Sequence, residues 1–122
     1  MSRWAAHFLV LGTEVHRMYC LELDKEGNLE QSFPLTEEIA GTSFVEGILL
    51  VVPVLSAYTQ EDIHRQLLTE CFPDYLSLAA YLAKRAFPTP AIGEKVRLFQ
   101  VRLHPFSTSE LSTDHSSSNR HI

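Results

Sequence analysis

The sequence F-V-E-G-I-L-L-V-V-P, residues 44–53, decides the fold of this chain. Its aliphatic run, residues 48–52, does not alternate with polar residues, and a strand of that kind is normally covered on both faces of its sheet. The β-branched residues of the run favour a strand over a helix. The stretch therefore predicts a central strand. Its side chains alternate between the two faces, with Ile48, Leu50 and Val52 on one and Leu49 and Val51 on the other.

The residues before the central strand predict a first strand followed by a β-hairpin. Residues 6–11 form the expected first strand, which ends at the turn-prone Gly12. Residues 15–23 alternate in polarity, and D-K-E-G at 24–27 is typical of a tight turn whose glycine takes a positive φ. Residues 28–33 return as the third strand, which completes the hairpin.

Two helices and a last strand are expected beyond the hairpin. Residues 36–41 favour a single helical turn before the central strand. The sequence T-Q-E-D, which begins at Thr59, is typical of a helix start with a capping threonine, and Asp74 caps a second helix after the break at Pro73. Residues 95–103 form the last strand, with a bulge or with burial on both faces.

These elements predict one α+β domain of residues 1–106, which suits a chain of 122 residues. We expect a largely antiparallel sheet of about five strands, in the order β-β-β-β-α-α-β, with the helix pair packed on one face. Residues 107–122 are rich in serine, and we expect a mobile, disordered C-terminal tail because they bury too little apolar area to offset ordering.

Composition excludes several classes of partner. The net charge of −5 argues against nucleic acid and anionic membranes, which positive charge attracts. Lys95, Arg97 and Arg102 on the last strand are too few to change this expectation. No window is long and apolar enough to span a membrane, and the N-terminal stretch is not typical of a signal peptide, so we expect a cytoplasmic protein. Cys20 and Cys71 are expected to be small buried residues in a reducing compartment rather than a disulfide.

Motifs for cofactors and metals are not found in the sequence. The histidines show no H-x-H or H-E-x-x-H spacing, and the five glycines are dispersed, so neither a Rossmann fingerprint nor a P-loop is present. No G-x-S-x-G motif marks a nucleophilic serine. We therefore expect no cofactor, no metal and no assigned catalytic residue.

The densest cluster of ionisable residues is Glu61, Asp62, His64 and Arg65. A carboxylate beside a histidine supports general acid–base chemistry, which makes His64, Glu61 and Asp62 the candidate catalytic residues. The same residues suit a helix start, because carboxylates are favoured in a first turn and Arg65 is spaced to pair with Glu61. We expect the helix-start role.

The first half of the chain resembles the N-terminal β-domain of amidohydrolases. The resemblance rests on D-K-E-G-N-L at 24–29 and G-I-L-L-V-V-P at 47–53, and it covers about residues 8–53. In that family the proline leads into glycine and a metal-binding His-x-His pair, whereas V-L-S-A-Y follows here at 54–58. The resemblance implies a stranded β-module without the catalytic barrel, and no catalytic residue carries over.

Two functions follow as hypotheses. We expect a non-catalytic interaction or accessory protein that acts through self-association or a partner-binding surface. The alternative is a small-molecule-binding protein or small enzyme, with a pocket between the helix pair and the sheet that uses His64 with Glu61 or Asp62. Because two helices cover only one face of the sheet, a two-fold homodimer is expected to cover the other. The competing outcome is a sheet that curls on itself, with the hairpin as its second layer.

Overall fold

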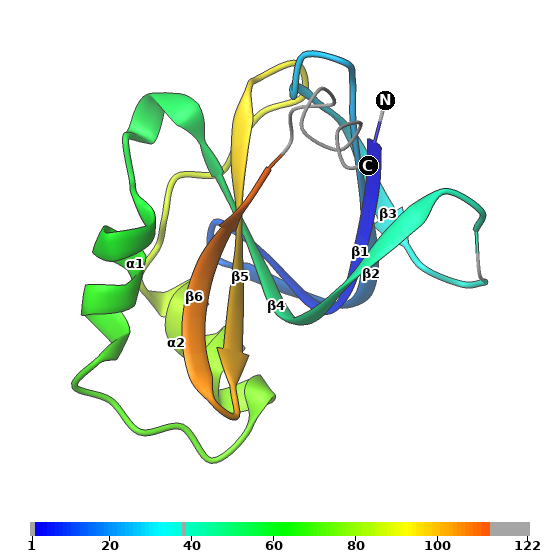
Figure 1. Cartoon of the computed structure of the whole chain (residues 1–122). Coiled ribbons are helices and arrows are strands. Elements are labelled where there is room, and N and C mark those ends of the chain that lie inside the picture. The colour runs from blue at the N-terminus through cyan, green and yellow to red at the C-terminus, as the bar shows by residue number, and fades with distance from the viewer. Residues whose placement is uncertain (1, 38, 113–122) are drawn as a thin grey trace, which may run out of the picture.

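The computed structural model describes residues 2–37 and 39–112. One mixed six-stranded sheet has the order β3-β2-β1-β4-β5-β6 (Figure 1). Every neighbouring pair is antiparallel except β1 and β4, which are parallel. The elements are β1 (Ser2–Leu11), β2 (Glu14–Leu23), β3 (Leu29–Pro34), β4 (Thr42–Pro53), the 3-10 helix η1 (Val54–Ser56), α1 (Gln60–Leu67), α2 (Tyr75–Lys84), β5 (Val96–Leu103) and β6 (Phe106–Leu111).

The expected α+β class, the hairpin, the central strand and the two helices are confirmed. The sheet has six strands rather than about five, and it is largely antiparallel as expected, with one parallel pair that makes it mixed. The parallel pair arises because the segment after β3 crosses back over β2 and β1, which places β4 beside β1. Within the described part of that crossing segment no helical turn forms, so the prediction of a turn at 36–41 is wrong there.

The boundary expected at residue 107 for a mobile tail is also wrong. Phe106–Leu111 form β6, which pairs with β5 from Leu98↔Leu111 to Leu103↔Phe106. We expected no strand here because the segment is polar and follows a proline. The prediction failed because β5 supplies backbone hydrogen-bond partners, which composition does not reveal. Residues 113–122, the remainder of the expected tail, lie outside the described residues.

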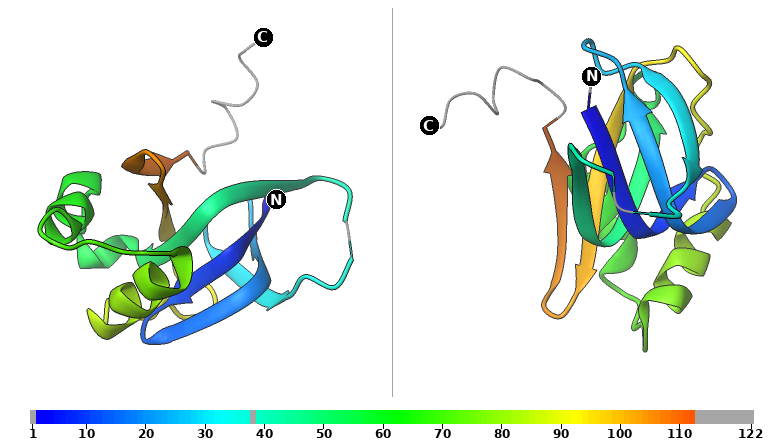
Figure 2. Two further views of the ribbon diagram at one scale, coloured as in Figure 1. Left: turned by 90° about the horizontal axis from the view of Figure 1, so that it is seen from below. Right: turned by 90° about the vertical axis from the view of Figure 1, so that its right-hand side faces the viewer.

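The sheet curls on itself (Figure 2). Asn28 and Lys95 form an isolated antiparallel bridge between the β2–β3 turn and the residue before β5. The Leu29 N–H donates to the Glu94 carbonyl at 2.9 Å, and the Gly93 N–H donates to the Leu29 carbonyl at 2.7 Å. The start of β3 therefore meets the start of β5, which closes one end of the curled sheet.

Two hydrophobic cores lie on opposite faces of β4. The outer core packs the sheet against both helices, and its members include Ile48, Leu50, Val52, Ile63, Leu67, Leu78 and Leu82. The inner core fills the curl of the sheet, and its members include Leu9, Leu21, Leu23, Leu29, Leu49, Val51 and Leu98.

The predicted alternation of the central strand is therefore confirmed. Leu49 and Val51 have no exposed surface, because the hairpin covers them within the same chain. We expected a dimer because the two helices would leave the second face of the sheet uncovered. That reason is wrong, because the sheet curls on itself and covers this face within one chain. The dimer itself stays a prediction.

Both predicted helix caps are present. The Thr59 hydroxyl accepts from the Asp62 N–H at 3.2 Å while the Asp62 carboxylate accepts from the Thr59 N–H at 2.9 Å, which is a capping box. The Asp74 carboxylate accepts from the Ser77 N–H at 2.8 Å. Within residues 2–37 and 39–112, neither helix has the length and apolar content needed to cross a membrane.

Candidate functional site

The predicted acid–base cluster is distributed around the start of α1. Backbone and side-chain hydrogen bonds from Thr59 hold the pKa of Asp62 below its usual range. Asp62 also lies 3.5 Å from Arg65, the residue expected to pair with Glu61. Asp62 is therefore an ionised helix-start group, as expected, and is poorly suited to donate a proton near neutral pH.

His64 faces β6 rather than a carboxylate. Its Nδ1 atom lies 3.1 Å from the Thr108 hydroxyl, and its ring stacks on Phe106 with 5.0 Å between centroids. His64 and Glu61 do line two shallow surface hollows, of about 240 and 220 Å³, beside α1. The space between the helix pair and the sheet is instead filled by the outer core.

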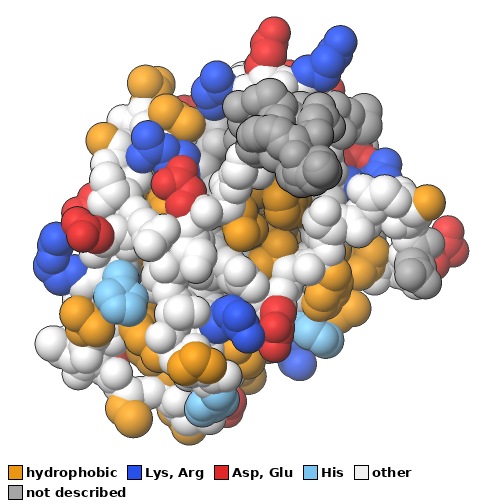
Figure 3. Space-filling view, viewed as in Figure 1, with side chains coloured by type: hydrophobic (Ala, Val, Ile, Leu, Met, Phe, Trp, Pro, Cys, Tyr) orange, Lys and Arg blue, Asp and Glu red, His pale blue; other side chains and the backbone are white. Residues whose placement is uncertain are grey.

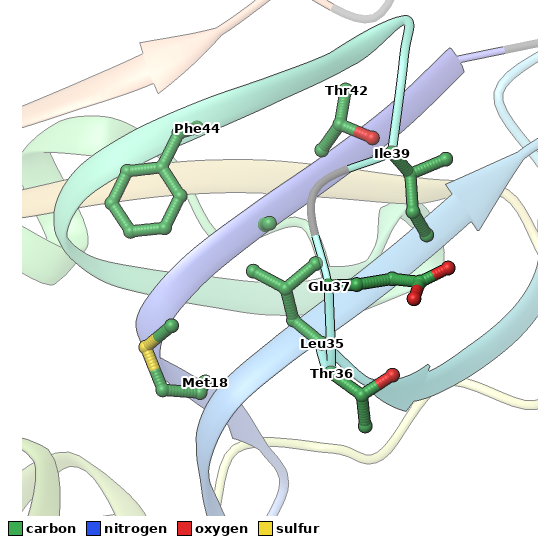
Figure 4. A pocket seen from close by; sticks show the side chains of 8 residues that line it. Met18, Leu35, Thr36, Glu37, Ile39, Thr42 and Phe44 are labelled. Atoms are coloured by element: carbon green, nitrogen blue, oxygen red, sulfur yellow. The ribbon is translucent and has the colours of Figure 1, made fainter.

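A larger hollow lies on the outer face, under the β3–β4 connection (residues 35–37 and 39–41 of the described part). It has a volume of about 430 Å³, and we call it the connection pocket (Figure 4). Its lining residues come from β1, β2, β4 and the connection: Ala5, Met18, Leu35, Thr36, Glu37, Ile39, Thr42 and Phe44.

Strand pairing explains why the sheet is hollow there. Ala5 is in register with Cys20 on β2 and with Phe44 on β4, so these side chains form one cross-strand row. Ala6 and Val45, the next residues, belong to the inner core, so Ala5 and Phe44 point to the opposite face. Ala5 is the smallest side chain of the row, and the connection passes above it to form the second wall.

Two large hydrophobic side chains are exposed beside this pocket. Phe44 is 52% exposed and Met18 is 39% exposed, although both lie on strands. The His7 ring meets the Phe44 ring edge to face, with centroids 5.4 Å apart. Figure 3 shows hydrophobic side chains exposed on the face of the molecule seen there. The pocket is thus a mainly apolar hollow with an apolar rim, although Glu37 and two threonines also line it.

A polar row lies next to the apolar row. Gln31, Glu22, Arg3 and Thr42 follow one another in register across β3, β2, β1 and β4. Glu22 is only 6% exposed, and hydrogen bonds from Gln31 and Arg3 lower the pKa of its carboxyl. The Thr42 Oγ1 atom is buried and has no hydrogen-bond partner among the described residues.

The connection pocket lies next to a buried thiol, that of Cys20. Burial raises the pKa of the Cys20 thiol, the residue beside Ala5, which disfavours a thiolate nucleophile. Among the described residues, no three side chains of His, Cys, Asp or Glu lie close enough to hold a metal ion. Both cysteines are free, but Cys71 is exposed, so its predicted burial is wrong.

Sequence reasoning missed the connection pocket. The apolar Leu35 and Ile39 were available as a signal, but the segment was assigned to a helical turn. The exposed position of Phe44 was hidden because the residue adjoins the buried run of β4.

Comparison with models of protein families, with curated proteins and with solved structures finds no match to this chain. The resemblance to the N-terminal β-domain of amidohydrolases therefore stays a prediction.

Proposed function

We propose that this chain is a non-catalytic binding module that takes a compact apolar side chain of a protein partner into the connection pocket. The observation that carries the proposal is the coincidence of a hollow of about 430 Å³ with the half-exposed Phe44 and Met18 at its rim. Exposed apolar residues around a concave site are typical of interaction surfaces.

The energetics suit a single anchoring residue. Burying one leucine-sized side chain contributes about 1.5–3 kcal/mol, and contacts at the rim add to this. An isolated anchor of that size binds with a dissociation constant on the order of 10 mM or weaker, because 1 mM already requires about 4 kcal/mol of net binding energy and association costs offset part of the gain. A partner would reach higher affinity by adding contacts around Phe44 and the connection.

N-acetyl-leucinamide is a suitable probe because it isolates the anchoring side chain. We expect saturable methyl shifts of Met18, Leu35 and Ile39 in NMR spectra, with a dissociation constant on the order of 10 mM. N-acetyl-serinamide should produce no such shifts, because its side chain has little apolar area to bury. Equal responses to both compounds would contradict the proposal.

Variants of the pocket supply the controls. Ala5→Leu should fill the hollow and abolish binding, and Phe44→Ser should remove a wall and weaken binding severalfold. Leu76→Ser on α2 is the matched control, since Leu76 is 51% exposed and Phe44 is 52% exposed. Binding that survives both pocket variants, or that is lost in Leu76→Ser, would reject this site.

A small apolar molecule is the second candidate ligand. Its support is the pocket volume, which lies within the range of about 300–1,000 Å³ that is typical of small-molecule sites. This replaces the expected location between the helix pair and the sheet. Two results together would favour this candidate. A small molecule would bind at micromolar concentration, and leucine-containing peptides would bind no more tightly than N-acetyl-leucinamide.

Self-association is the variant of the proposal in which the partner is a second copy. Sedimentation equilibrium distinguishes it from binding to another protein. A mass above the 13.8 kDa of the single chain that falls to this value in Ala5→Leu would assign the pocket to a dimer. A constant 13.8 kDa in the wild type would exclude the dimer and leave a different partner.

A further inference from the structure

The β3–β4 connection is tied to the sheet at both ends. At its start, the Leu35 N–H donates to the Met18 carbonyl at 2.8 Å. Near its end, the Arg3 Nη1 atom donates to the Ala40 carbonyl at 3.0 Å. The first tie is a backbone contact that most sequences can make, whereas the second depends on one side chain.

Arg3 is itself held in place by a buried carboxylate. Its Nε atom donates to Glu22 Oε2 at 2.7 Å, and Gln31 Nε2 donates to the other oxygen, Oε1, at 2.7 Å. Both carboxylate oxygens of Glu22 are therefore used, and the guanidinium plane is oriented with Nη1 toward Ala40. Charge-assisted bonds of this geometry are among the stronger ones in proteins.

The position of this network explains its importance for the pocket. Arg3 is in register with Thr42, and Ala5 is in register with Phe44, so the polar row adjoins the floor of the connection pocket. Ala40 directly follows Ile39, which lines the pocket. Holding Ala40 therefore restricts how far the Ile39 side of the pocket can move from the sheet.

We propose that Arg3 and Glu22 are positioning residues of the connection pocket. They hold the connection at the distance from the sheet that leaves room for an apolar side chain. This inference rests on the proposed binding function. Neither residue is among those that line the pocket, so they act through the connection. A site held in its binding geometry before the ligand arrives avoids the cost of ordering it during binding.

The test measures backbone order of the connection without any ligand. In the wild type, we expect NMR order parameters of about 0.85 for Ala40 and Gly41, as in rigid backbone. Arg3→Gln and Glu22→Gln should lower these values below about 0.6. Arg3→Lys should give intermediate values, since lysine keeps the charge but cannot donate to Glu22 and Ala40 in a fixed fork.

Glu46→Gln is the matched control. Glu46 pairs with Arg102 at 3.3 Å on the same sheet, and among residues 2–37 and 39–112 its polar contacts are with Arg102 and Gln100 rather than with the connection. Unchanged order at Ala40 and Gly41 in Arg3→Gln and Glu22→Gln would overturn the inference. Order lost equally throughout β4 would also overturn it, because general destabilisation would then explain the result.

Titration with N-acetyl-leucinamide separates this inference from the proposed function. We expect about tenfold weaker binding to Arg3→Gln than to Glu46→Gln, as for a site that is ordered only part of the time. Absence of binding to the wild type rejects the proposed function, while the order parameters still decide whether Arg3 holds the connection. Equal affinity of the two variants would show that holding the connection does not serve binding.

Discussion

Asp62 stabilises a helix start, and the geometry around it leaves little for proton transfer. Its carboxylate accepts from both the N–H and the hydroxyl of Thr59, each at 2.9 Å. A capping motif satisfies backbone donors that would otherwise lack partners. The sequence predicted this role correctly because capping depends on residues that are adjacent in the chain.

Thr59→Ala should therefore lower the free energy of unfolding by about 0.5–2 kcal/mol, the usual cost of a lost N-cap. Urea denaturation of the wild type and the variant measures this difference. Thr69→Ala is the control, because Thr69 follows α1 and is exposed. A loss below about 0.3 kcal/mol in Thr59→Ala would mean that the cap contributes little.

Glu22 makes stability depend on pH. Because its folded pKa is lowered, its ionised form stabilises the fold above the pKa of the unfolded chain, and this stabilisation is lost as the pH falls through the folded pKa. The difference in unfolding free energy between wild type and Glu22→Gln should shrink as urea titrations move from pH 6 toward pH 3. If this free-energy difference stayed constant with pH, it would contradict the hydrogen bonds that Gln31 and Arg3 donate to Glu22. The comparison of two chains cancels the similar effects of Asp24, Asp62 and Asp74.

At the scale of elements, local patterns predicted the hairpin, the central strand and both helices, but not β6 or the crossing connection. Strand β6 contains few large apolar residues, and its support comes from distant elements. The Glu110 N–H donates to Gln60 on α1 at 2.8 Å, and Thr108 contacts His64. Such partners are separated by tens of residues in sequence, so periodicity does not reveal them.

Removal of β6 should destabilise the domain. We compare a chain that ends at Pro105 with one that ends at Ser112, so that both lack the same later residues. The shorter chain should melt at least about 5 °C lower, since it loses the edge pairing of β5 and the contacts to α1. Equal melting temperatures would show that β6 does not contribute to the folded domain.

At the scale of the whole molecule, the curled sheet lets one chain bury both faces of β4. The sequence showed which faces are apolar, because alternation is local. It did not show what covers them, because the contact between the starts of β3 and β5 joins segments far apart in the chain. The expectation of a dimer followed from treating the sheet as open and flat, whereas sheets twist and curl.

Leu49 and Leu50 test this arrangement because they are adjacent in sequence but belong to different cores. Leu49 belongs to the inner core and Leu50 to the outer core, and neither is exposed. Leu49→Ala and Leu50→Ala should each lower the unfolding free energy by about 2–5 kcal/mol, as for buried leucines elsewhere. A loss below about 1 kcal/mol in Leu49→Ala, independent of protein concentration, would mean that the inner face is not packed in the single chain.

Intermolecular nuclear Overhauser effects from the methyl groups of N-acetyl-leucinamide would locate the bound leucine side chain directly. Binding in the connection pocket predicts effects to the methyl groups of Ala5, Met18 and Ile39, with loss of these effects in Ala5→Leu. The other exposed apolar residues provide the contrary outcome. Effects confined to Leu55, Leu68 or Ile92, which are 87%, 60% and 68% exposed, would place the binding surface elsewhere and contradict the proposed function.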